Sequence, residues 1–198
     1  DCIIIENVPE YVLPISKKTN RKIILHLHND RLNINTKNAL KIVQKCYKIL
    51  VLSNFVGDRV KGISSNYATK VHTLYNGIDT KRFGKEKYKN EIVKLKNKYN
   101  IPIDNKVILY TGRIVPEKGV KELVQAFSNL TLDNVKLVIA GSSDYGENKE
   151  SNYISEIKNI ANKNVIFTGY VDYKDIPSLY GIADLGVIPS IWEEPFAL

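Results

Sequence analysis

The chain of 198 residues has no methionine, one tryptophan and only two cysteines. Cys2 and Cys46 lie far apart in the sequence and match neither a zinc-binding nor a redox spacing. Each stands in an apolar stretch, so we expect both to be buried free thiols. Two unpaired thiols fit a reducing compartment, and we therefore expect a cytoplasmic protein.

Long hydrophobic runs are also missing. No apolar stretch approaches the roughly 20 residues of a transmembrane helix, and the sequence shows no signal peptide. The chain begins inside a predicted strand and stops soon after a Pro-Phe turn, so we expect it to be a piece of a longer protein.

The formal net charge of +8 comes without a basic block. The lysines are scattered, and no aromatic-basic ladder or zinc spacing accompanies them, which argues against nucleic acid as a partner. An anionic membrane surface and phosphorylated substrates remain open as partners. Peripheral contact with the inner face of the cell membrane is thus one expectation for this charge.

Several well-known catalytic motifs are absent. The sequence has no Gly-x-Gly-x-x-Gly, no Walker lysine loop, no Gly-x-Ser-x-Gly and no His/Cys/carboxylate spacing typical of a metal site. These absences argue against dehydrogenases, P-loop ATPases, serine hydrolases and metalloenzymes.

Short apolar strands that alternate with helical patterns predict a parallel α/β architecture. In the first half we expect a helix capped by Thr36 or Asn38, with Leu40, Val43 and Tyr47 on its buried face, and a second helix capped by Ser53. The composition becomes polar and rich in lysine after Asn76, so we place a domain boundary between about 76 and 102. The predicted strands are 2–5, 22–27, 48–52, 71–75, 107–111, 135–140, 165–168 and 185–188, and the later helices are 120–127, 153–161 and 176–182.

One predicted strand runs directly into a glycine, two cations and the start of a helix. Gly112 permits close backbone approach, and Arg113 and Lys118 lie on the turn that leads into the helix. The free N–H groups and the dipole at a helix N-terminus favour an anion. This arrangement predicts a phosphate-binding turn.

The other strands of the second half end in similar turns. Because ligands of open parallel sheets bind outside the carboxyl ends of the strands, these turns share one rim. A phosphorylated, nucleotide-like ligand is favoured there. The segments on this rim are Gly112-Arg113, Gly141-Ser142-Ser143, Gly169-Tyr170 and Pro189-Ser190.

Glu193 and Glu194 follow the last strand, so at least one carboxylate should lie near the same rim. A carboxylate repels phosphate but accepts hydrogen bonds from the hydroxyls of a sugar or ribose. Trp192 either stacks on a sugar face or packs the loop, and the sequence leaves both open. We expect His26 and His28 to point to opposite faces of their strand and not to line one pocket.

These segments, taken in order, resemble retaining glycosyltransferases of the GT-B fold, in the "glycosyl transferases group 1" family of bacterial capsule, lipopolysaccharide and cell-wall polysaccharide enzymes. The resemblance extends over nearly the whole chain. It rests on Tyr75-Asn-Gly-Ile-Asp79 with Phe83, Thr111 to Gly119, Val138-Ile-Ala-Gly141, Phe167-Thr-Gly169, Tyr180-Gly-Ile-Ala-Asp184 and Pro189 to Phe196.

The resemblance implies parts of two Rossmann-like domains. Residues 1–80 would be the C-terminal part of the acceptor-side domain, 81–102 a linker with a connecting helix, and 103–198 the N-terminal part of the domain that binds the nucleotide sugar. The chain would thus be the central fragment of a transferase that moves a sugar from a nucleotide diphosphate to a saccharide or lipid-linked acceptor. A non-catalytic nucleotide-sugar-binding module, a GT-B phosphorylase and an epimerase are the alternatives.

The resemblance also implies roles for individual residues. Arg113 and Lys118, with Gly112, would neutralise the donor diphosphate, so that no metal or other cofactor is needed. Glu194 would contact donor-sugar hydroxyls, and His28, less securely His26, would lie near the reaction centre. The base and sugar would be held by Gly141, Ser142, Tyr170, Val171, Phe196, Ala197 and Leu198.

Two departures from the family pattern accompany these matches. Ala197 stands where the family usually has glycine. The second glutamate of the family's Glu-x7-Glu motif would fall beyond Leu198. We therefore do not expect this piece to turn over substrate alone.

Overall fold

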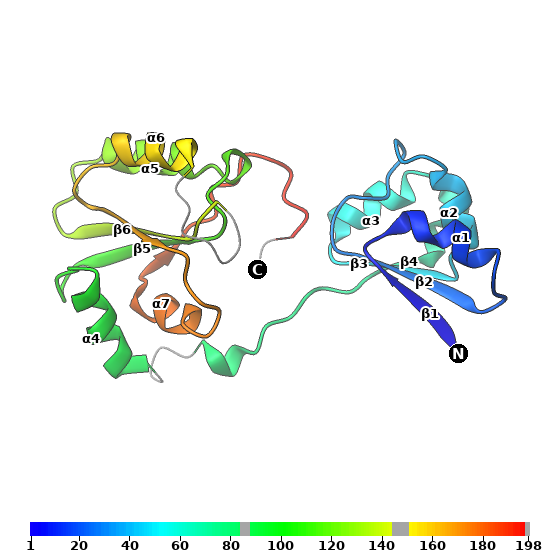
Figure 1. Cartoon of the computed structure of the whole chain (residues 1–198), viewed down its shortest axis with the longest axis horizontal. Helices are drawn as coiled ribbons and strands as arrows, with labels where there is room; N and C mark the ends of the chain where they lie inside the picture. The colour runs from blue at the N-terminus through cyan, green and yellow to red at the C-terminus, as the bar shows by residue number, and fades with distance from the viewer. Residues whose placement is uncertain (84–87, 144–150, 197–198) are drawn as a thin grey trace. The chain divides into compact units, whose positions relative to one another are not determined.

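A computed structural model describes residues 1–83, 88–143 and 151–196 of the chain. It divides into two compact units, one formed by residues 1–78 with 194–198 and the other by residues 79–193. Figure 1 shows a parallel sheet with helices in each unit. The fold class is therefore α/β, and each unit is described by itself below.

The first unit contains a four-stranded parallel sheet with the order β1-β2-β3-β4. Its helices pack on one face of this sheet (Figure 1). Alternate strand residues such as Ile5, Leu25 and Ile49 are buried under the helices, whereas Ile4 on the opposite face is 56% exposed. The elements are β1 (Cys2–Glu6), α1 (Val12–Ser16), β2 (Lys22–Leu27), α2 (Ala39–Lys45), β3 (Lys48–Val51), α3 (Asn54–Lys61) and β4 (Val71–Thr73), with short 3-10 helices at Pro9–Tyr11 and Ser65–Lys70.

The predicted cap of α3 is confirmed, because the Ser53 hydroxyl accepts a hydrogen bond from the Val56 N–H at 3.3 Å. Of the two predicted caps of α2, Asn38 occupies the N-cap position. It has the left-handed conformation (φ 60°), and its side chain makes no capping hydrogen bond. The Thr36 hydroxyl instead accepts from the Asn33 N–H, inside the preceding loop.

The predicted buried face of α2 is also partly wrong. Leu40 and Tyr47 are 45% and 47% exposed, whereas Ala39, Ile42 and Val43 are buried. These three residues form the helical stripe that faces the sheet. Tyr47 lies beyond the end of the helix, where its N–H donates to the Ile23 carbonyl.

Only one of the two cysteines is buried as predicted. Cys46 lies in the core of the first unit, and Cys2 is exposed at the start of β1. Among the described residues β1 pairs with β2 alone, so this strand stands at an edge of the sheet. Its first residue is therefore less covered than the apolar sequence suggested.

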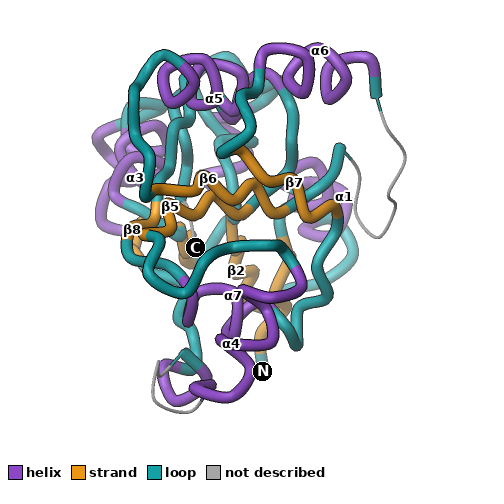
Figure 2. Tube along the Cα trace, turned by 90° about the vertical axis from the view of Figure 1, so that its left-hand side faces the viewer, coloured by secondary structure: helices purple, strands orange, loops and turns teal. Residues whose placement is uncertain are grey.

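The second unit has a parallel sheet with the order β7-β6-β5-β8. Helices α5 and α6 cover one face and α4 and α7 cover the other (Figures 1 and 2). Each face has its own apolar core. The elements are α4 (Lys89–Lys98), β5 (Lys106–Thr111), α5 (Val120–Ser128), β6 (Val135–Ala140), α6 (Asn152–Ile160), β7 (Val165–Gly169), α7 (Ile176–Ile182) and β8 (Leu185–Gly186), with 3-10 helices at Thr80–Arg82 and Pro116–Lys118.

The strand order places β5 between β6 and β8. From β5 the chain continues to β6 on one side, and it later returns to β8 on the other side. The connection from β5 to β6 runs through α5 on one face, and β8 returns to the other edge of β5 after α7 on the opposite face. Such a change of direction opens a crevice at the carboxyl ends of the strands. The end of β5, with Thr111 and Gly112, is therefore the place where a ligand is expected. None of the helices in the described ranges has the length and hydropathy needed to cross a lipid bilayer.

Candidate functional site

Backbone hydrogen bonds join the carboxyl ends of β5, β6 and β7. The Gly112 N–H donates to the Ala140 carbonyl at 3.0 Å, and the Gly141 N–H donates to the Gly169 carbonyl at 2.9 Å. One step further, the Ile114 N–H donates to the Ser142 carbonyl at 2.8 Å. These bonds join three of the four strand ends that the sequence predicted to share one rim.

Gly141 is the residue that allows this close approach. Its φ is 152°, and a Cβ atom built on it would lie 1.8 Å from the Gly112 carbonyl oxygen. A side chain there would force the ends of β5 and β6 apart. The backbone itself therefore forms this part of the rim.

The turn after β5 is held by a side chain of that strand and by a second loop. The Tyr110 hydroxyl donates to the Arg113 carbonyl at 2.6 Å. Gly119, in the left-handed conformation (φ 65°), lies directly against the Pro189 carbonyl, and the Ile191 N–H donates to the Glu117 carbonyl at 3.1 Å. The turn that carries Arg113 and Lys118 and the loop after β8 thus form one structure.

Both predicted cations reach the surface of this turn. The Arg113 guanidinium lies 3.8 Å from the Glu117 carboxylate, and both side chains are about 40% exposed. The Lys118 ammonium lies 5.5 Å from the centre of the Trp192 ring. At this distance the ring attracts the cation electrostatically. Trp192 thus lies beside the Lys118 ammonium, and its stacking on a sugar face stays a prediction.

A pocket of about 210 Å³ lies on the rim. It brings together six of the residues predicted to hold the donor, namely Gly112, Arg113, Gly141, Ser142, Tyr170 and Val171. Sequence reasoning missed the remaining lining residues, Thr111, Ala140 and Ile176.

Two of the missed residues had a signal in the sequence. Thr111 and Ala140 are the last residues of their strands, so their positions follow from the same strand-end argument, whereas Ile176 is the first residue of α7. The Thr111 hydroxyl lies 2.7 Å from the Tyr180 hydroxyl, which ties the end of β5 to α7.

The segment after the loop belongs to the first unit. Glu194 and Phe196 are grouped with residues 1–78, and the Phe196 ring stacks on Tyr75 with 6.1 Å between centroids. Phe196 also packs against the core of that unit. The predicted site residues Ala197 and Leu198 lie outside the described residues.

A cluster of titratable side chains lies at the carboxyl ends of β1 and β2. His26 Nδ1 and His28 Nε2 lie 3.1 and 3.0 Å from the same Glu6 oxygen, Oε2, and the two rings are 4.3 Å apart. The expectation that the two histidines face opposite sides is therefore wrong. Residues two apart in a strand project on the same side, and this spacing continues from His26 to His28 just past the end of β2.

The histidines change the electrostatics of the carboxylate between them. A hydrogen bond from His28, together with electrostatic attraction from His26 and His28, holds the pKa of the Glu6 carboxyl below its ordinary value. Glu6 is therefore ionised at neutral pH and accepts from both rings. Within the described ranges, Glu6, His26 and His28 are also a group whose ligand atoms lie close enough together to hold a metal ion.

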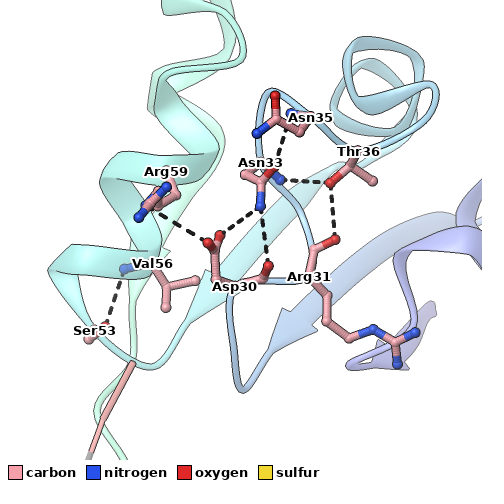
Figure 3. A network of polar contacts seen from close by, with 8 residues as sticks. All are labelled: Asp30, Arg31, Asn33, Asn35, Thr36, Ser53, Val56 and Arg59. Atoms are coloured by element: carbon pink, nitrogen blue, oxygen red, sulfur yellow. Dashed lines mark hydrogen bonds and ion pairs between the residues drawn. The ribbon is translucent and has the colours of Figure 1, made fainter. Parts of the chain in front are cut away.

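The loop that follows His28 is fixed by hydrogen bonds among its own residues (Figure 3). Asn33 donates to the carboxylate and the carbonyl of Asp30, and the Thr36 hydroxyl donates to the Arg31 carbonyl. Arg59 of α3 lies 3.8 Å from the Asp30 carboxylate. This loop and α3 line a cavity of about 390 Å³.

Comparison with known proteins identifies the family. Residues 91–198 match the family described as "Glycosyl transferases group 1". The chain is 31% identical over 206 residues to the lipopolysaccharide 1,2-N-acetylglucosaminetransferase of Salmonella typhimurium, covering 99% of this chain and 50% of that protein. The chain spans about half the length of the curated relatives it matches.

Solved structures support the same fold. The structure of Anabaena Alr3699/HepE in complex with UDP has a TM-score of 0.77 and 21% identity, with 98% of this chain and 55% of that chain covered. The complex of Alr3699/HepE with UDP-glucose has a TM-score of 0.72 and 20% identity, with 98% and 55% covered. The family match extends over more than half of the sequence and includes the whole rim with Arg113, Lys118 and the pocket, and this chain belongs to the glycosyl transferases group 1 family.

Proposed function

We propose that this chain is part of a retaining glycosyltransferase that transfers a sugar from a nucleotide diphosphate to a saccharide or lipid-linked acceptor during synthesis of a surface polysaccharide or glycolipid. The observation that carries the proposal is the pocket at the ends of β5, β6 and β7, with two cations on the adjoining turn. Family membership and the UDP and UDP-glucose found in the structures of Alr3699/HepE support a nucleotide-sugar donor.

Arg113 and Lys118 would bind the donor diphosphate. As the bond between the sugar and the diphosphate breaks, negative charge grows on the leaving group, and two fixed cations stabilise that charge. They would take the role that a metal ion has in other transferases, so we propose that the reaction needs no metal or other cofactor. The contact of Lys118 with Trp192 would hold the ammonium on the turn before the donor binds.

The pocket would receive the base and ribose. Its walls combine backbone at Gly112 and Gly141 with the side chains of Tyr170 and Val171. Concave, largely apolar pockets with a few polar groups are typical of sites that bind a small ligand. Ser142, which is buried, would offer its hydroxyl to the ribose.

The remaining predicted residues would act on the sugar. Glu194 would accept hydrogen bonds from sugar hydroxyls, and His28 would lie near the reaction centre, with Phe196 and the backbone of Ala197 and Leu198 at the sugar and phosphate. The Glu6 carboxylate at 3.0 Å from Nε2 would fix the His28 ring. We propose a cytoplasmic enzyme, with peripheral attachment to the anionic inner face of the membrane through its net charge of +8.

Thermal unfolding of the full-length protein with UDP, GDP, ADP and their sugars tests the donor site. One nucleotide should raise the melting temperature by mass action, and Arg113→Ala and Lys118→Ala should each remove most of that rise. Lys106→Ala is the matched control, because Lys106 lies at the amino end of the same strand, β5. If every nucleotide leaves the melting temperature unchanged, the donor site is wrong.

A transfer assay separates an enzyme from a binding module. Incubation with the donor that stabilises the protein and with short saccharide or lipid-linked acceptors should give a product whose anomeric configuration, read by NMR, equals that of the donor. Nucleotide binding without transfer to any acceptor would favour the non-catalytic module. Inversion of the configuration would contradict retention.

A further inference from the structure

Three side chains of the kinds that bind transition metals meet at the carboxyl ends of β1 and β2 in the first sheet. Glu6 ends β1, His26 lies near the end of β2, and His28 follows that strand. Of these three residues, the proposed reaction uses only His28 directly. The grouping of all three side chains therefore raises the question of whether they bind a metal ion.

The distances suit a small divalent cation. His26 Nδ1 and His28 Nε2 lie 3.1 and 3.0 Å from Glu6 Oε2, and all three atoms lie within 4.8 Å of one another. Zinc bound tetrahedrally at about 2.0–2.1 Å requires ligand atoms about 3.3 Å apart. The Glu6 and His28 side chains are exposed, so they have room to rotate to that spacing.

The backbone under the group holds it in place. Parallel pairing puts Glu6 beside His26, and the two-residue spacing puts His28 on the same side. Asn7, in the left-handed conformation (φ 56°), bridges the strands, since its N–H donates to the His26 carbonyl at 2.7 Å and its side chain accepts from the His28 N–H at 3.0 Å. The backbone thus holds the three residues side by side without an ion.

Two of the three side chains are exposed, so the group is open to solvent on one side. The side chains of Glu6 and His28 are 59% and 38% exposed, whereas that of His26 is 17% exposed. His26 Nε2 is buried and has no hydrogen-bond partner, so Nδ1 is the atom of this ring that faces the group. An ion held here has three protein ligands and space for water.

We propose that Glu6 Oε2, His26 Nδ1 and His28 Nε2 form a binding site for Zn²⁺, with water as the fourth ligand. Two imidazoles and a carboxylate are ligands that suit zinc, and three protein ligands with one open position are a common zinc arrangement. The site is distinct from the cations Arg113 and Lys118. A bound ion occupies His28 Nε2, so on the proposed function it withdraws that imidazole from the reaction and acts as an inhibitor.

Zinc binding is measured by titrating the chelator-treated full-length protein with ZnCl₂ in a calorimeter. The His26→Ala and Glu6→Gln variants should each bind one equivalent of zinc fewer, or bind it with an affinity at least about tenfold lower. His72→Ala is the matched control. His72 is in the row of paired residues that includes His26, but two strands away, about 10 Å, which is too far to share the ion. Its binding should match that of the unsubstituted protein.

A second measurement does not depend on substitution. In NMR spectra of the unsubstituted protein, ZnCl₂ should shift the ring signals of His26 and His28 and leave those of His72 in place. Equal zinc binding by all variants, or equal shifts at all three histidines, would overturn the site. Both measurements omit nucleotide and acceptor, so they succeed or fail independently of the transferase proposal.

Discussion

The two units build the same kind of sheet but end their strands differently. In the second unit the rim is made of backbone, with Gly112, Gly141 and Gly169 bonded to their neighbours. In the first unit the rim is made of side chains, with Glu6, His26 and His28 in mutual contact. Backbone N–H groups beside cations suit phosphate, whereas carboxylates and imidazoles suit hydroxyls, protons and metals.

The two units also differ in how their sheets are covered. The second sheet has helices on both faces, and Val138 and Ile139, adjacent in β6, are both fully buried. Among the described residues of the first unit, the helices pack on one face only, and Ile4 is 56% exposed on the other. The unfolding of each unit can be followed separately. Both cysteines, which can be alkylated, are in the first unit, and the single tryptophan, Trp192, which fluoresces, is in the second.

The largest expected effect concerns the two thiols of the first unit. Burial raises the pKa of the Cys46 thiol to about 12 from an ordinary 9.0. At pH 8 its thiolate fraction is therefore about a thousandfold smaller than that of an ordinary thiol, and burial blocks the reagent as well. Mass spectrometry after brief alkylation should find the exposed Cys2 modified and Cys46 intact.

The same shift has a defined pH dependence. Because the folded pKa of Cys46 lies above the unfolded value, its contribution to stability is complete below pH 9.0 and is lost as the pH rises toward about 12. Cys46→Ala should flatten the fall of the unfolding midpoint in that range. Rapid alkylation of Cys46 at pH 8 would show that the core of the first unit opens readily.

The next effect concerns the backbone rim of the second unit. Gly141→Ala adds a Cβ that meets the Gly112 carbonyl and forces alanine to a φ of 152°. We expect a loss of about 3 kcal/mol in the free energy of unfolding, measured by urea with Trp192 fluorescence as the signal. Gly186→Ala is the control, since its Cβ meets no atom within 4 Å. Equal effects of the two substitutions would refute the argument from close approach.

The smallest of the three effects concerns a side-chain clamp of the first unit. The Lys70 ammonium donates to the carbonyls of Val43, Gln44 and Cys46 at 3.2, 2.9 and 2.7 Å, at the end of α2. Lys70→Met keeps the aliphatic stem but leaves these carbonyls without their donor. We expect a loss of about 2 kcal/mol in the free energy of unfolding. The measurement is the urea concentration at which Cys46 becomes half-accessible to alkylation.

Lys61→Met is the matched control for the clamp. Lys61 lies in an exposed pair with Asp58 at 3.4 Å on the surface of α3. Such a pair contributes little, so its loss should lower the free energy of unfolding by no more than about 0.5 kcal/mol. If Lys70→Met lowers the free energy of unfolding no more than Lys61→Met does, then water replaces the Lys70 ammonium at the three carbonyls without loss of stability.

Local pattern predicted much of the fold. The helix at 176–182 and the strands at 22–27 and 135–140 were predicted with the bounds that the structure has. Apolar periodicity and a helix cap such as Ser53 act over a few residues, so they can be read from the sequence. The short helix α1 was missed, because the Pro-bearing stretch around it has no clear period.

Side-chain exposure was harder to predict. The exposed positions of Cys2, Leu40 and Tyr47 depend on which neighbouring segments cover them, and apolar character alone does not carry that information. The same holds for the contact of His26, His28 and Glu6. Glu6 is twenty residues from His26 in sequence, and only the parallel register of β1 and β2 brings the two together.

The sequence by itself determined the parallel α/β class, the family and the glycine-led strand ends with Arg113 and Lys118, because each of these depends on residue types at short spacing. The tertiary structure decided the rest: how Gly141 passes the Gly112 carbonyl, how Trp192 meets Lys118, and how Glu6 joins two histidines. Each of these contacts joins residues from different strands or loops. They depend on strand order and register, which are fixed only when the whole unit packs.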